Sequence, residues 1–214
     1  MAGDGSRFKN QGLGDYKPFT KIRDSYLVEL TINSISLNNI SSLTFGIRDE
    51  HENSFQVSQK LKTIWPSCNI VKMKKTRGNL ETCLKAMVDI KIPSCDPVLF
   101  MDCDNPFVKP GILNLCFKNN SDATLLGFYD KEKTNKWCYI DQNNNTVTGV
   151  YEKNILSAGL NPVALIGFFA FKSSCEFKKT ANKILTSEDY IKGEYYMSQS
   201  IKEYIKNKKN VNLI

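Results

Sequence analysis

The sequence predicts an α/β fold, in which a Rossmann-like, mostly parallel sheet is covered by helices on both faces and carries a small antiparallel insertion. Two observations support this prediction. Short apolar runs of strand length alternate with segments of helical periodicity, which favours parallel strands connected by helices. After Lys136 two segments, 137–140 and 147–151, flank the turn-forming residues 141–145, which predicts one hairpin. With 214 residues and a hydrophobic fraction of 41%, the chain can bury a sizeable core.

The expected strands and helices follow one another along the chain. Helical periodicity predicts a first helix through Leu27 and Ile35 with Ser25 as its cap, and a second pattern through Phe55 and Ile64. Apolar runs of strand length lie at 43–47, 69–73, 97–101, 123–128 and 163–171, the last of which is apolar enough for a central buried strand. Further helices are expected directly after Gly78 and over 110–118, 174–185 and 195–207.

The net charge of +7 raises the question of a nucleic-acid partner, because clustered Lys and Arg attract phosphate. The lysines are spread along the chain, however, and no stacking motif of aromatic residues interleaves them. A solvated, lysine-rich surface is therefore the preferred interpretation, and it includes the cluster formed by Lys72, Lys74, Lys75 and Arg77. A basic cleft would also suit a small, phosphate-rich substrate.

The seven cysteines form no CxxC pair, which gives little support to a zinc site or a thioredoxin-like redox site. Cys83, Cys103 and Cys116 fall in apolar runs, where a small buried hydrophobe is the default interpretation, and the pattern is typical of a reducing compartment. The first residues contain no apolar signal core, and the longest apolar run, 163–171, is far shorter than the roughly 20 residues of a membrane span. We therefore expect a cytoplasmic protein without membrane insertion.

The opening segment carries the most informative pattern. Gly3 and Gly5 stand at alternate positions, Arg7 follows them, and Lys17-Pro18 comes ten residues after the arginine. Glycines at alternate positions let the backbone approach phosphate oxygens and point its N–H groups at them. The arginine adds a planar fork of donors, and the lysine adds a compact positive charge. The expected nucleotide-binding residues of this segment are Ala2, Gly3, Asp4, Gly5, Ser6, Arg7 and Lys17.

This pattern resembles the signature of the sugar-phosphate nucleotidyltransferases, in which a glycine-rich loop ending in Arg-Phe or Arg-Leu precedes a Lys-Pro. Later segments resemble the family in the same order, so that the resemblance spans almost the whole chain. Within the family, the pattern resembles that of small capsule and surface-polysaccharide enzymes, including cytidylyltransferases that act on phosphocholine-like or other phosphorylated acceptors. The matching segments are Gly78-Asn79 at the nucleotide base, Asp102 and Asp104 at a metal, Glu152-Lys153 and Gly167 at the acceptor, and Gly193 to Tyr196 before the penultimate helix.

The resemblance implies transfer of a nucleotidyl group from a nucleoside triphosphate to a sugar 1-phosphate or a phosphocholine-like acceptor, with release of pyrophosphate. Arg7 and Lys17 would be the catalytic cations, and Asp104, with Asp102, would hold Mg²⁺ against the triphosphate. Residues i and i+2 of a strand face the same side, so both carboxylates reach one ion if strand geometry continues that far. The implied partners are the triphosphate and the acceptor, with no nucleic acid; a homo-oligomer is left open.

The chain departs from the family pattern near both ends. We interpret residues 1–214 as a single nucleotidyltransferase-like domain that lacks the family's first strand, before the glycine loop, and its C-terminal strand. Tyr16 stands where relatives usually have a proline. No glutamine lies at Val71-Lys72-Met73, ahead of Gly78, so the sequence does not predict which base is bound.

Simpler interpretations of the same residues stay open. Asp102 and Asp104 could mark the polar end of a strand, Gly78 could form a turn before a helix, and Glu152-Lys153 could be an exposed charge pair. The single histidine, His51, has three acidic neighbours and is expected on the surface. No Ser/His/Asp or Cys/His triad is supported.

Two other functions are compatible with the sequence. One is a non-catalytic or truncated relative that still binds nucleotide. The other is a metal-dependent glycosyltransferase, because an Asp-x-Asp segment after a strand also binds nucleotide-sugars through a metal. The glycine segment with Arg7 and Lys17 argues against the glycosyltransferase, since an enzyme that uses finished nucleotide-sugars has no leaving pyrophosphate to hold.

Overall fold

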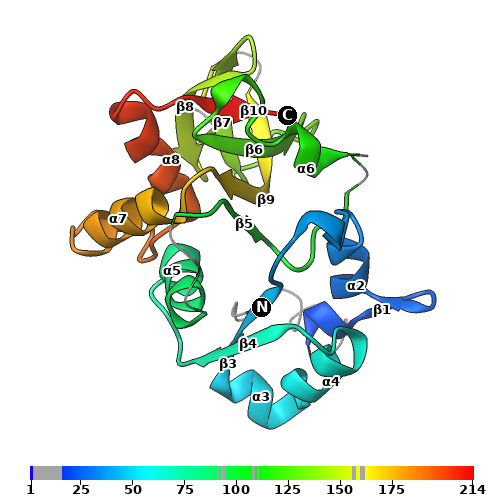
Figure 1. Cartoon of the computed structure of the whole chain (residues 1–214). Helices are drawn as coiled ribbons and strands as arrows, with labels where there is room; N and C mark the ends of the chain where they lie inside the picture. The colour runs from blue at the N-terminus through cyan, green and yellow to red at the C-terminus, as the bar shows by residue number, and fades with distance from the viewer. Residues whose placement is uncertain are drawn as a thin grey trace. The chain divides into compact units, whose positions relative to one another are not determined.

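A computed structural model of the chain describes residue 1 and residues 16–90, 92, 95–107, 109, 111–155, 158–159 and 162–214 (Figure 1). The chain forms two compact units. The first contains Met1–Thr76, Lys85–Lys91 and Asp102–Leu113, and the second contains Arg77–Leu84, Ile92–Met101 and Asn114–Ile214. Each unit therefore brings together stretches that are far apart in sequence. The helices α5 (Asn79–Asp89) and α6 (Ile112–Leu115) contribute residues to both units.

The first unit is built on a parallel pair of strands, β3 (Thr44–Arg48) and β4 (Asn69–Met73). A parallel pair needs a crossover connection, and here the helices α3 (Asp49–Phe55) and α4 (Val57–Ile64) provide it. Gln56 joins the two helices in the left-handed conformation, at φ 51°. Shorter elements precede β3: η1 (Lys17–Phe19), β1 (Lys21–Ile22), β2 (Ser25–Tyr26), α2 (Leu27–Ile32) and η2 (Leu37–Asn39).

The core of the first unit is apolar and is formed by Val28, Ile32, Phe45, Ile47, Val57, Leu61 and Cys68. Met1, Tyr16 and Cys103 are partly buried and pack against this same cluster. Burial of the core therefore also fixes three residues that adjoin predicted site residues: the residue before the glycine segment, the residue before Lys17, and the residue between Asp102 and Asp104.

The second unit contains a mixed sheet. Its strands lie in the order β5-β9-β6-β10-β8-β7, and β7 also pairs with β9, so that β9, β6, β10, β8 and β7 close into a small barrel. Because the barrel is closed, each of these five strands has a hydrogen-bonded neighbour on both sides. The strands are β5 (Val98–Met101), β6 (Ala123–Phe128), β7 (Cys138–Asn143), β8 (Thr146–Glu152), β9 (Val163–Phe171) and β10 (Val211–Leu213).

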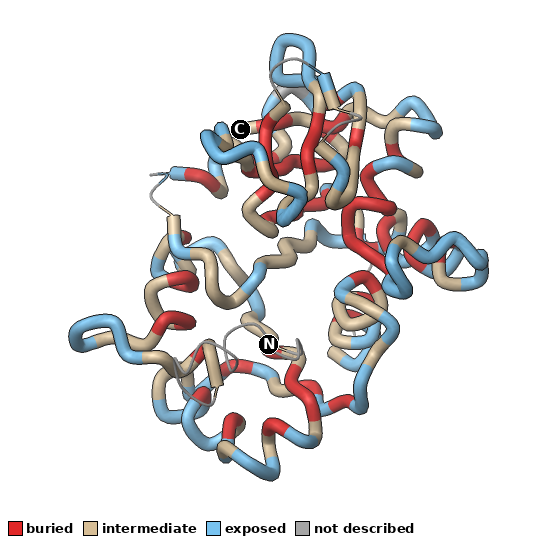
Figure 2. Tube along the Cα trace, turned by 180° about the vertical axis from the view of Figure 1, so that it is seen from behind, coloured by how far each residue is buried: buried red, intermediate tan, exposed pale blue. Residues whose placement is uncertain are grey.

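Two helices pack beside the barrel, and their side chains complete the core of the second unit. The aromatic ring of Phe171, at the end of β9, lies 4.7 Å from Phe177 on α7 (Ser174–Leu185) and 5.2 Å from Tyr204 on α8 (Met197–Lys206). All three side chains are buried. Figure 2 shows how buried and exposed stretches alternate along the chain. α7 and α8 lie side by side in Figure 1.

The prediction of a mostly parallel, Rossmann-like sheet was wrong. Among the strands that the structure describes, only β6 with β10 and β3 with β4 pair in parallel, whereas β5, β6 and β7 all run antiparallel to β9. The α/β composition itself is confirmed. Hydrophobic periodicity indicates which residues are buried but not which way a strand runs. β9 has neighbours along both edges and is a central strand, as expected.

Most individual elements were predicted correctly. The strands at 69–73, 123–128 and 163–171, the hairpin and the helix at 174–185 are confirmed. The hairpin turns at Asn144 and Asn145, both at positive φ, as a tight two-residue turn requires. The helix expected over 110–118 is only the single turn of α6 followed by η3 (Lys118–Asn120), and β10 was not predicted.

Two local expectations differ from the structure. Tyr26, not Ser25, caps α2, because its N–H donates to Glu29 Oε2 at 2.6 Å while Ser25 lies in β2. His51 is buried, not exposed, since its ring packs 4.8 Å from the ring of Tyr16. The acidic residues next to His51 in the sequence do not indicate this contact, because Tyr16 lies 35 positions earlier in the chain.

A disulfide joins Cys95 to Cys175, two residues separated by 80 positions, and so ties the segment before β5 to the first turn of α7. The N–H of Ser174 donates to the carbonyl of Asp96 at 2.9 Å beside it. The sequence interpretation, which favoured reduced cysteines, did not predict this pair. Cys116 is buried as expected, whereas Cys103 and Cys83 are half-buried. None of the helices in the described part of the chain is long and apolar enough to cross a bilayer.

Candidate functional site

The predicted glycine segment, Ala2, Gly3, Asp4, Gly5, Ser6 and Arg7, lies outside the described residues. The described residues on either side of it lie close together. Tyr16 Oη donates a hydrogen bond to the carbonyl oxygen of Met1 at 2.9 Å, although 15 positions separate the two residues. The ring of Tyr16 stacks on Phe55 at 5.2 Å, and burial raises the pKa of its hydroxyl, so that it stays a neutral donor.

Lys17 lies at the start of η1 and points at a carboxylate from a distant part of the same unit. Its Nζ contacts Asp104 Oδ2 at 2.5 Å, across 87 positions of sequence. The buried Pro18 fixes the backbone immediately after the lysine, and the N–H of Phe19 donates to the carbonyl of Tyr16 at 3.0 Å. The lysine side chain is 37% exposed and that of Asp104 is 25% exposed, so the pair is accessible to solvent and to a ligand. The structure thus brings two sequence-predicted residues into direct contact.

Asp102 and Asp104 do not lie on one continuous strand. The strand β5 ends at Met101, so strand geometry does not continue through 102–104, and the argument that i and i+2 face one side does not apply. Asp102 is exposed, and Asn105 Nδ2 lies 3.5 Å from its Oδ2. Cys103, between the two carboxylates, packs on the core of the first unit.

Within the described part of the chain, no three His, Cys, Asp or Glu side chains gather as a metal site. This does not conflict with Mg²⁺, because that ion commonly takes only one or two protein carboxylates and completes its octahedron with substrate phosphates and water. Asp104, which is accessible and already faces a cation, and Asp102 supply hard oxygen donors of the required kind. The donor set fits an ion that arrives with a triphosphate, and it does not fit an all-protein cage.

Gly78 and Asn79, expected at the nucleotide base, are held against the segment that precedes α8 and the first residue of that helix. Gly78 has φ +139°, and a Cβ there would lie 2.2 Å from the carbonyl oxygen of Tyr195. Hydrogen bonds flank this close approach, since Tyr195 N–H donates to the Arg77 carbonyl at 2.8 Å and Leu80 N–H donates to the Tyr195 carbonyl at 3.2 Å. The structure therefore supplies a reason for glycine at this position that is independent of any ligand.

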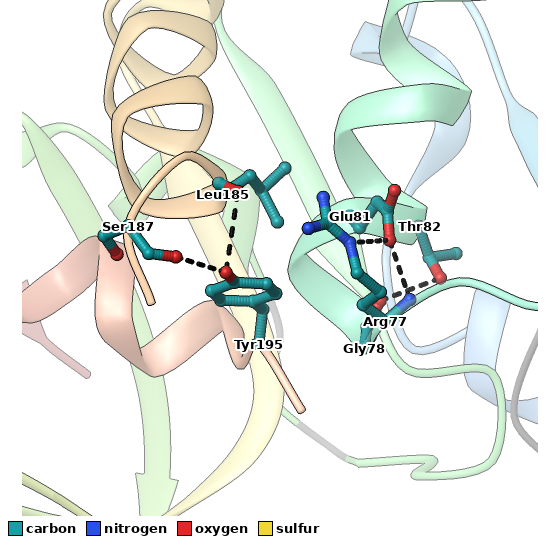
Figure 3. Close-up of polar contacts among 7 residues, drawn as sticks. All are labelled: Arg77, Gly78, Glu81, Thr82, Leu185, Ser187 and Tyr195. Carbon is teal, nitrogen blue, oxygen red and sulfur yellow. Dashed lines mark hydrogen bonds and ion pairs between the residues drawn. The ribbon is translucent and has the colours of Figure 1, made fainter. Parts of the chain in front are cut away.

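Side-chain interactions also hold the segment around Gly78 against the segment that precedes α8. The guanidinium of Arg77 lies 5.1 Å from the centre of the Tyr195 ring, and its Nε donates to Glu81 Oε2 at 3.2 Å (Figure 3). The hydrogen bond with Glu81 raises the pKa of Arg77 further above its ordinary value. Tyr195 Oη donates to the carbonyl of Ser187. Asn79 Oδ1 accepts from the N–H of Met197 at 2.8 Å and so caps the first turn of α8.

Glu152 and Lys153, expected at the acceptor, end β8 and follow it. Lys153 adopts the left-handed conformation, φ 50°, which is uncommon outside glycine, and its N–H donates to the carbonyl of Trp137 at 3.0 Å. Its Nζ donates to Tyr196 Oη at 2.5 Å and lies 4.4 Å from the centre of that ring. Glu152 Oε2 accepts from Ser198 Oγ at 2.7 Å.

Cys138 pairs with Glu152 across the hairpin. Burial raises the pKa of the Cys138 thiol well above its usual range, and the Glu152 carboxylate adds to the effect. The thiol therefore stays neutral and contributes no second charge beside Glu152.

Gly167 lies within β9 at a positive φ of 76°. On the β6 side the register passes from Leu165 opposite Gly127 to Phe169 opposite Leu125, so that β9 carries extra residues at this point. Gly167 thus forms a bulge in the central strand, a conformation that glycine adopts without steric cost.

Two residues that the sequence interpretation missed, Tyr196 and Ser198, contact Lys153 and Glu152. A signal for them exists: directly after Met197, its first residue, α8 contains Ser198, Gln199 and Ser200, three consecutive polar residues that are all buried. Buried polar side chains need partners, so a polar run at the start of an amphipathic helix indicates contacts to another segment. The sequence alone does not show which segment.

The fold of this chain is similar to that of known proteins among the solved structures. No family model matches the chain, and no curated protein matches it. Among solved structures, a nucleoside-diphosphate-sugar pyrophosphorylase from Vibrio cholerae RC9 is similar with a TM-score of 0.80 and 20% identity, over 100% of this chain and 88% of that one. An inositol-1-phosphate CTP transferase from T. maritima is similar with a TM-score of 0.72 and 14% identity, over 100% of this chain and 82% of that one. The chain shares their fold.

Proposed function

We propose that the protein is a nucleotidyltransferase that transfers a nucleotidyl group from a nucleoside triphosphate to a phosphorylated small molecule and releases pyrophosphate. Two similar solved structures are a pyrophosphorylase and a CTP transferase, and their fold extends over the full length of this chain. The observation that carries the proposal is the accessible contact of Lys17 with Asp104, because it joins the residue proposed to bind phosphate to the residue proposed to bind the metal.

The reaction needs charge neutralisation more than proton transfer. An oxygen of the acceptor phosphate attacks the α-phosphorus, a new P–O bond forms, and the bond from the α-phosphorus to the oxygen shared with the β-phosphate breaks. Pyrophosphate leaves with that electron pair. Because both reactants are anions, positioned cations supply most of the catalysis, and no covalent intermediate is required.

Lys17 is proposed to neutralise charge that develops at the α-phosphate, and Arg7 with the backbone of residues 2–6 to hold the β- and γ-phosphates. Asp104, with Asp102, is proposed to hold a Mg²⁺ ion, which would neutralise the triphosphate oxygens when bound. Both side chains of the Lys17–Asp104 ion pair are accessible. Binding of a triphosphate would give the lysine a phosphate partner and free Asp104 Oδ2 to coordinate a metal ion.

Lys153 is proposed to attract the acceptor phosphate, and Glu152 to accept hydrogen bonds from the acceptor's hydroxyl groups, beside Gly167. The left-handed backbone of Lys153, held by the Trp137 carbonyl, supports this proposal, since such conformations cluster at functional sites. Gly78 and Asn79 are proposed to contact the nucleotide base through backbone groups, because the Asn79 side chain is engaged with α8. The acceptor is proposed to be a sugar 1-phosphate or a phosphocholine-like molecule, used in the cytoplasm for capsule or other surface-polysaccharide synthesis.

The test combines each of the four ribonucleoside triphosphates with glucose 1-phosphate, inositol 1-phosphate or phosphocholine, with and without Mg²⁺, and measures pyrophosphate. We expect pyrophosphate only when triphosphate, acceptor and metal are all present. Triphosphate binding in a thermal-shift measurement without pyrophosphate from any acceptor would instead indicate a non-catalytic nucleotide-binding protein. Hydrolysis of, or transfer from, a finished nucleotide-sugar without pyrophosphate release would indicate a glycosyltransferase.

A further inference from the structure

The start of α8, by which we mean residues 195–198 and so include the two residues before the helix, contacts both segments that resemble the family's base and acceptor sites. All of these contacts lie inside the second unit. Tyr195 exchanges backbone hydrogen bonds with Arg77 and Leu80, and the N–H of Met197 donates to Asn79. On the acceptor side, Tyr196 accepts from Lys153, and Ser198 donates to Glu152 at 2.7 Å. Consecutive residues of one segment therefore alternate between the two predicted sites.

The segment is itself firmly held, which makes it suited to fixing other side chains. Tyr196 N–H donates to Gln199 Oε1 at 2.7 Å, and Gln199 Nε2 donates to the carbonyl of Asp189 at 2.6 Å. Tyr195, Ser198 and Gln199 are all buried. Side chains on a backbone segment that is held in this way have few alternative rotamers. A catalytic or binding group acts best when the residues that contact it are fixed.

The two contacts differ in what they fix. A hydroxyl that donates to a carboxylate oxygen sets the plane of the carboxylate, because the donor occupies one lone-pair direction. A phenol oxygen that accepts from an ammonium, with the charge also lying near the aromatic ring, fixes the position of a long and otherwise flexible side chain. Glu152 and Lys153 are therefore held in an orientation before any ligand is bound.

We propose that Ser198 and Tyr196 are positioning residues for the acceptor: from the start of α8 they orient Glu152 and Lys153, the pair that binds the phosphorylated acceptor. This inference rests on the proposed nucleotidyl transfer. Ser198 and Tyr196 should therefore affect the affinity for the acceptor and not that for the nucleotide, even though the same segment contacts Gly78 and Asn79.

The test is the steady-state kinetics of Ser198→Ala, with the acceptor that supports pyrophosphate release among glucose 1-phosphate, inositol 1-phosphate and phosphocholine. We expect the KM for the acceptor to rise about tenfold, because a hydrogen bond to a charged group is lost. We expect the KM for the triphosphate to stay within about twofold, since no contact to the triphosphate is removed. Ser198→Thr keeps the hydroxyl and should restore the acceptor KM.

Ser200→Ala is the matched control. Ser200 is the same residue type on the same helix and is equally buried, but its Oγ donates to the carbonyl of Met197 and makes no contact with Glu152. The inference is overturned if Ser198→Ala and Ser200→Ala have the same acceptor KM, or if the acceptor and triphosphate KM values rise together in Ser198→Ala.

Tyr196→Phe gives a second measurement that does not depend on the folding of Ser198→Ala. The ring stays, so its packing and its contact with the ammonium are kept, and only the oxygen that accepts from Lys153 is lost. We expect a rise of about threefold to fivefold in the acceptor KM alone, smaller than for Ser198 because a ring contact remains. An unchanged acceptor KM would overturn the role of Tyr196. If the wild-type protein releases no pyrophosphate at all, the proposed function fails, which is a different result from an active enzyme whose variants behave like wild type.

Discussion

The two places where predicted site residues are in contact differ in how they are held. In the first unit, Lys17 and Asp104 form one ion pair whose side chains are 37% and 25% exposed. In the second unit, Glu152, Lys153, Gly78 and Asn79 all contact buried residues of the start of α8. An accessible ion pair contributes little to stability, whereas buried polar contacts are costly to break. The difference indicates that the second region is fixed before a ligand binds, while the first can exchange partners.

Replacement of Gly78 should have the largest effect. A Cβ at this residue would lie 2.2 Å from the Tyr195 carbonyl oxygen, and φ is +139°, so neither the backbone nor the neighbour accommodates alanine. We expect Gly78→Ala to lower the free energy of unfolding by about 3 kcal/mol or more in chemical denaturation.

Gly193→Ala is the control for this prediction. Gly193 also has a positive φ, +81°, but a Cβ there meets nothing within 4 Å, so we expect a loss of only about 1 kcal/mol from backbone strain. Equal effects of the two variants would mean that the close approach to Tyr195 is unimportant. If Gly78→Ala folds normally and loses only triphosphate affinity, Gly78 serves the nucleotide alone.

Lys17→Ala should abolish most activity while leaving the fold intact, in contrast to Gly78→Ala. We expect pyrophosphate release to fall on the order of a hundredfold or more, because a cation at the reacting phosphate is lost. The unfolding midpoint should change little, since the ion pair with Asp104 is accessible. Lys21→Ala, at an exposed lysine four positions later, is the control and should keep wild-type turnover. A large fall in stability in Lys17→Ala would assign a structural role to the pair.

Reduction of the disulfide tests the second unit separately. Removal of the link between Cys95 and Cys175, which closes a loop of 80 positions, should lower the free energy of unfolding by about 2–4 kcal/mol. Thermal unfolding with and without reductant measures this effect. In the double variant Cys95→Ala/Cys175→Ala the reductant should have no effect; a reductant effect of the same size there would show that another cysteine is responsible.

The smallest expected effect is at the surface of the second unit. The hydrogen bond from Lys183 holds the pKa of Glu203 below its ordinary value. A depressed folded-state pKa stabilises the protein above the unfolded pKa of about 4.3, and this contribution is lost as the pH falls through the folded value. Lys183 is 64% exposed, so Lys183→Met should lower the free energy of unfolding at pH 7 by less than about 1 kcal/mol. The difference from wild type should vanish below about pH 3; a difference that persists there would exclude this ion pair as its cause.

The sequence predicted local elements better than their assembly. The strands at 69–73 and 123–128 and the turn at Asn144 were predicted correctly because their signals, apolar runs and turn residues, are local. Strand direction has no such signal, which is why the barrel was predicted as a mostly parallel sheet. The burial of His51 and the disulfide each depend on a residue far away in the chain.

The candidate site shows the same limit. Family resemblance selected Lys17 and Asp104, but the 2.5 Å contact between them spans 87 positions and appears only when the chain is folded. Asp102 was grouped with Asp104 by a strand argument that fails because β5 ends at Met101. Ser198 belongs to no motif that the sequence interpretation used, and Tyr196 was matched only as part of the segment before the penultimate helix, without a site role. Only their contacts with Glu152 and Lys153 make them candidates.

The joining of the triphosphate's nucleotidyl group to the acceptor is the central step of the proposed reaction. Pyrophosphate and the nucleotidyl product should be measured together, with triphosphate and Mg²⁺ present, in reactions with and without the phosphorylated acceptor. We expect equal amounts of the two products in the complete reaction, neither product without acceptor, and both lowered about a hundredfold or more with Lys17→Ala. Pyrophosphate or phosphate released at the same rate without acceptor, or in Lys17→Ala, would contradict the proposed transfer.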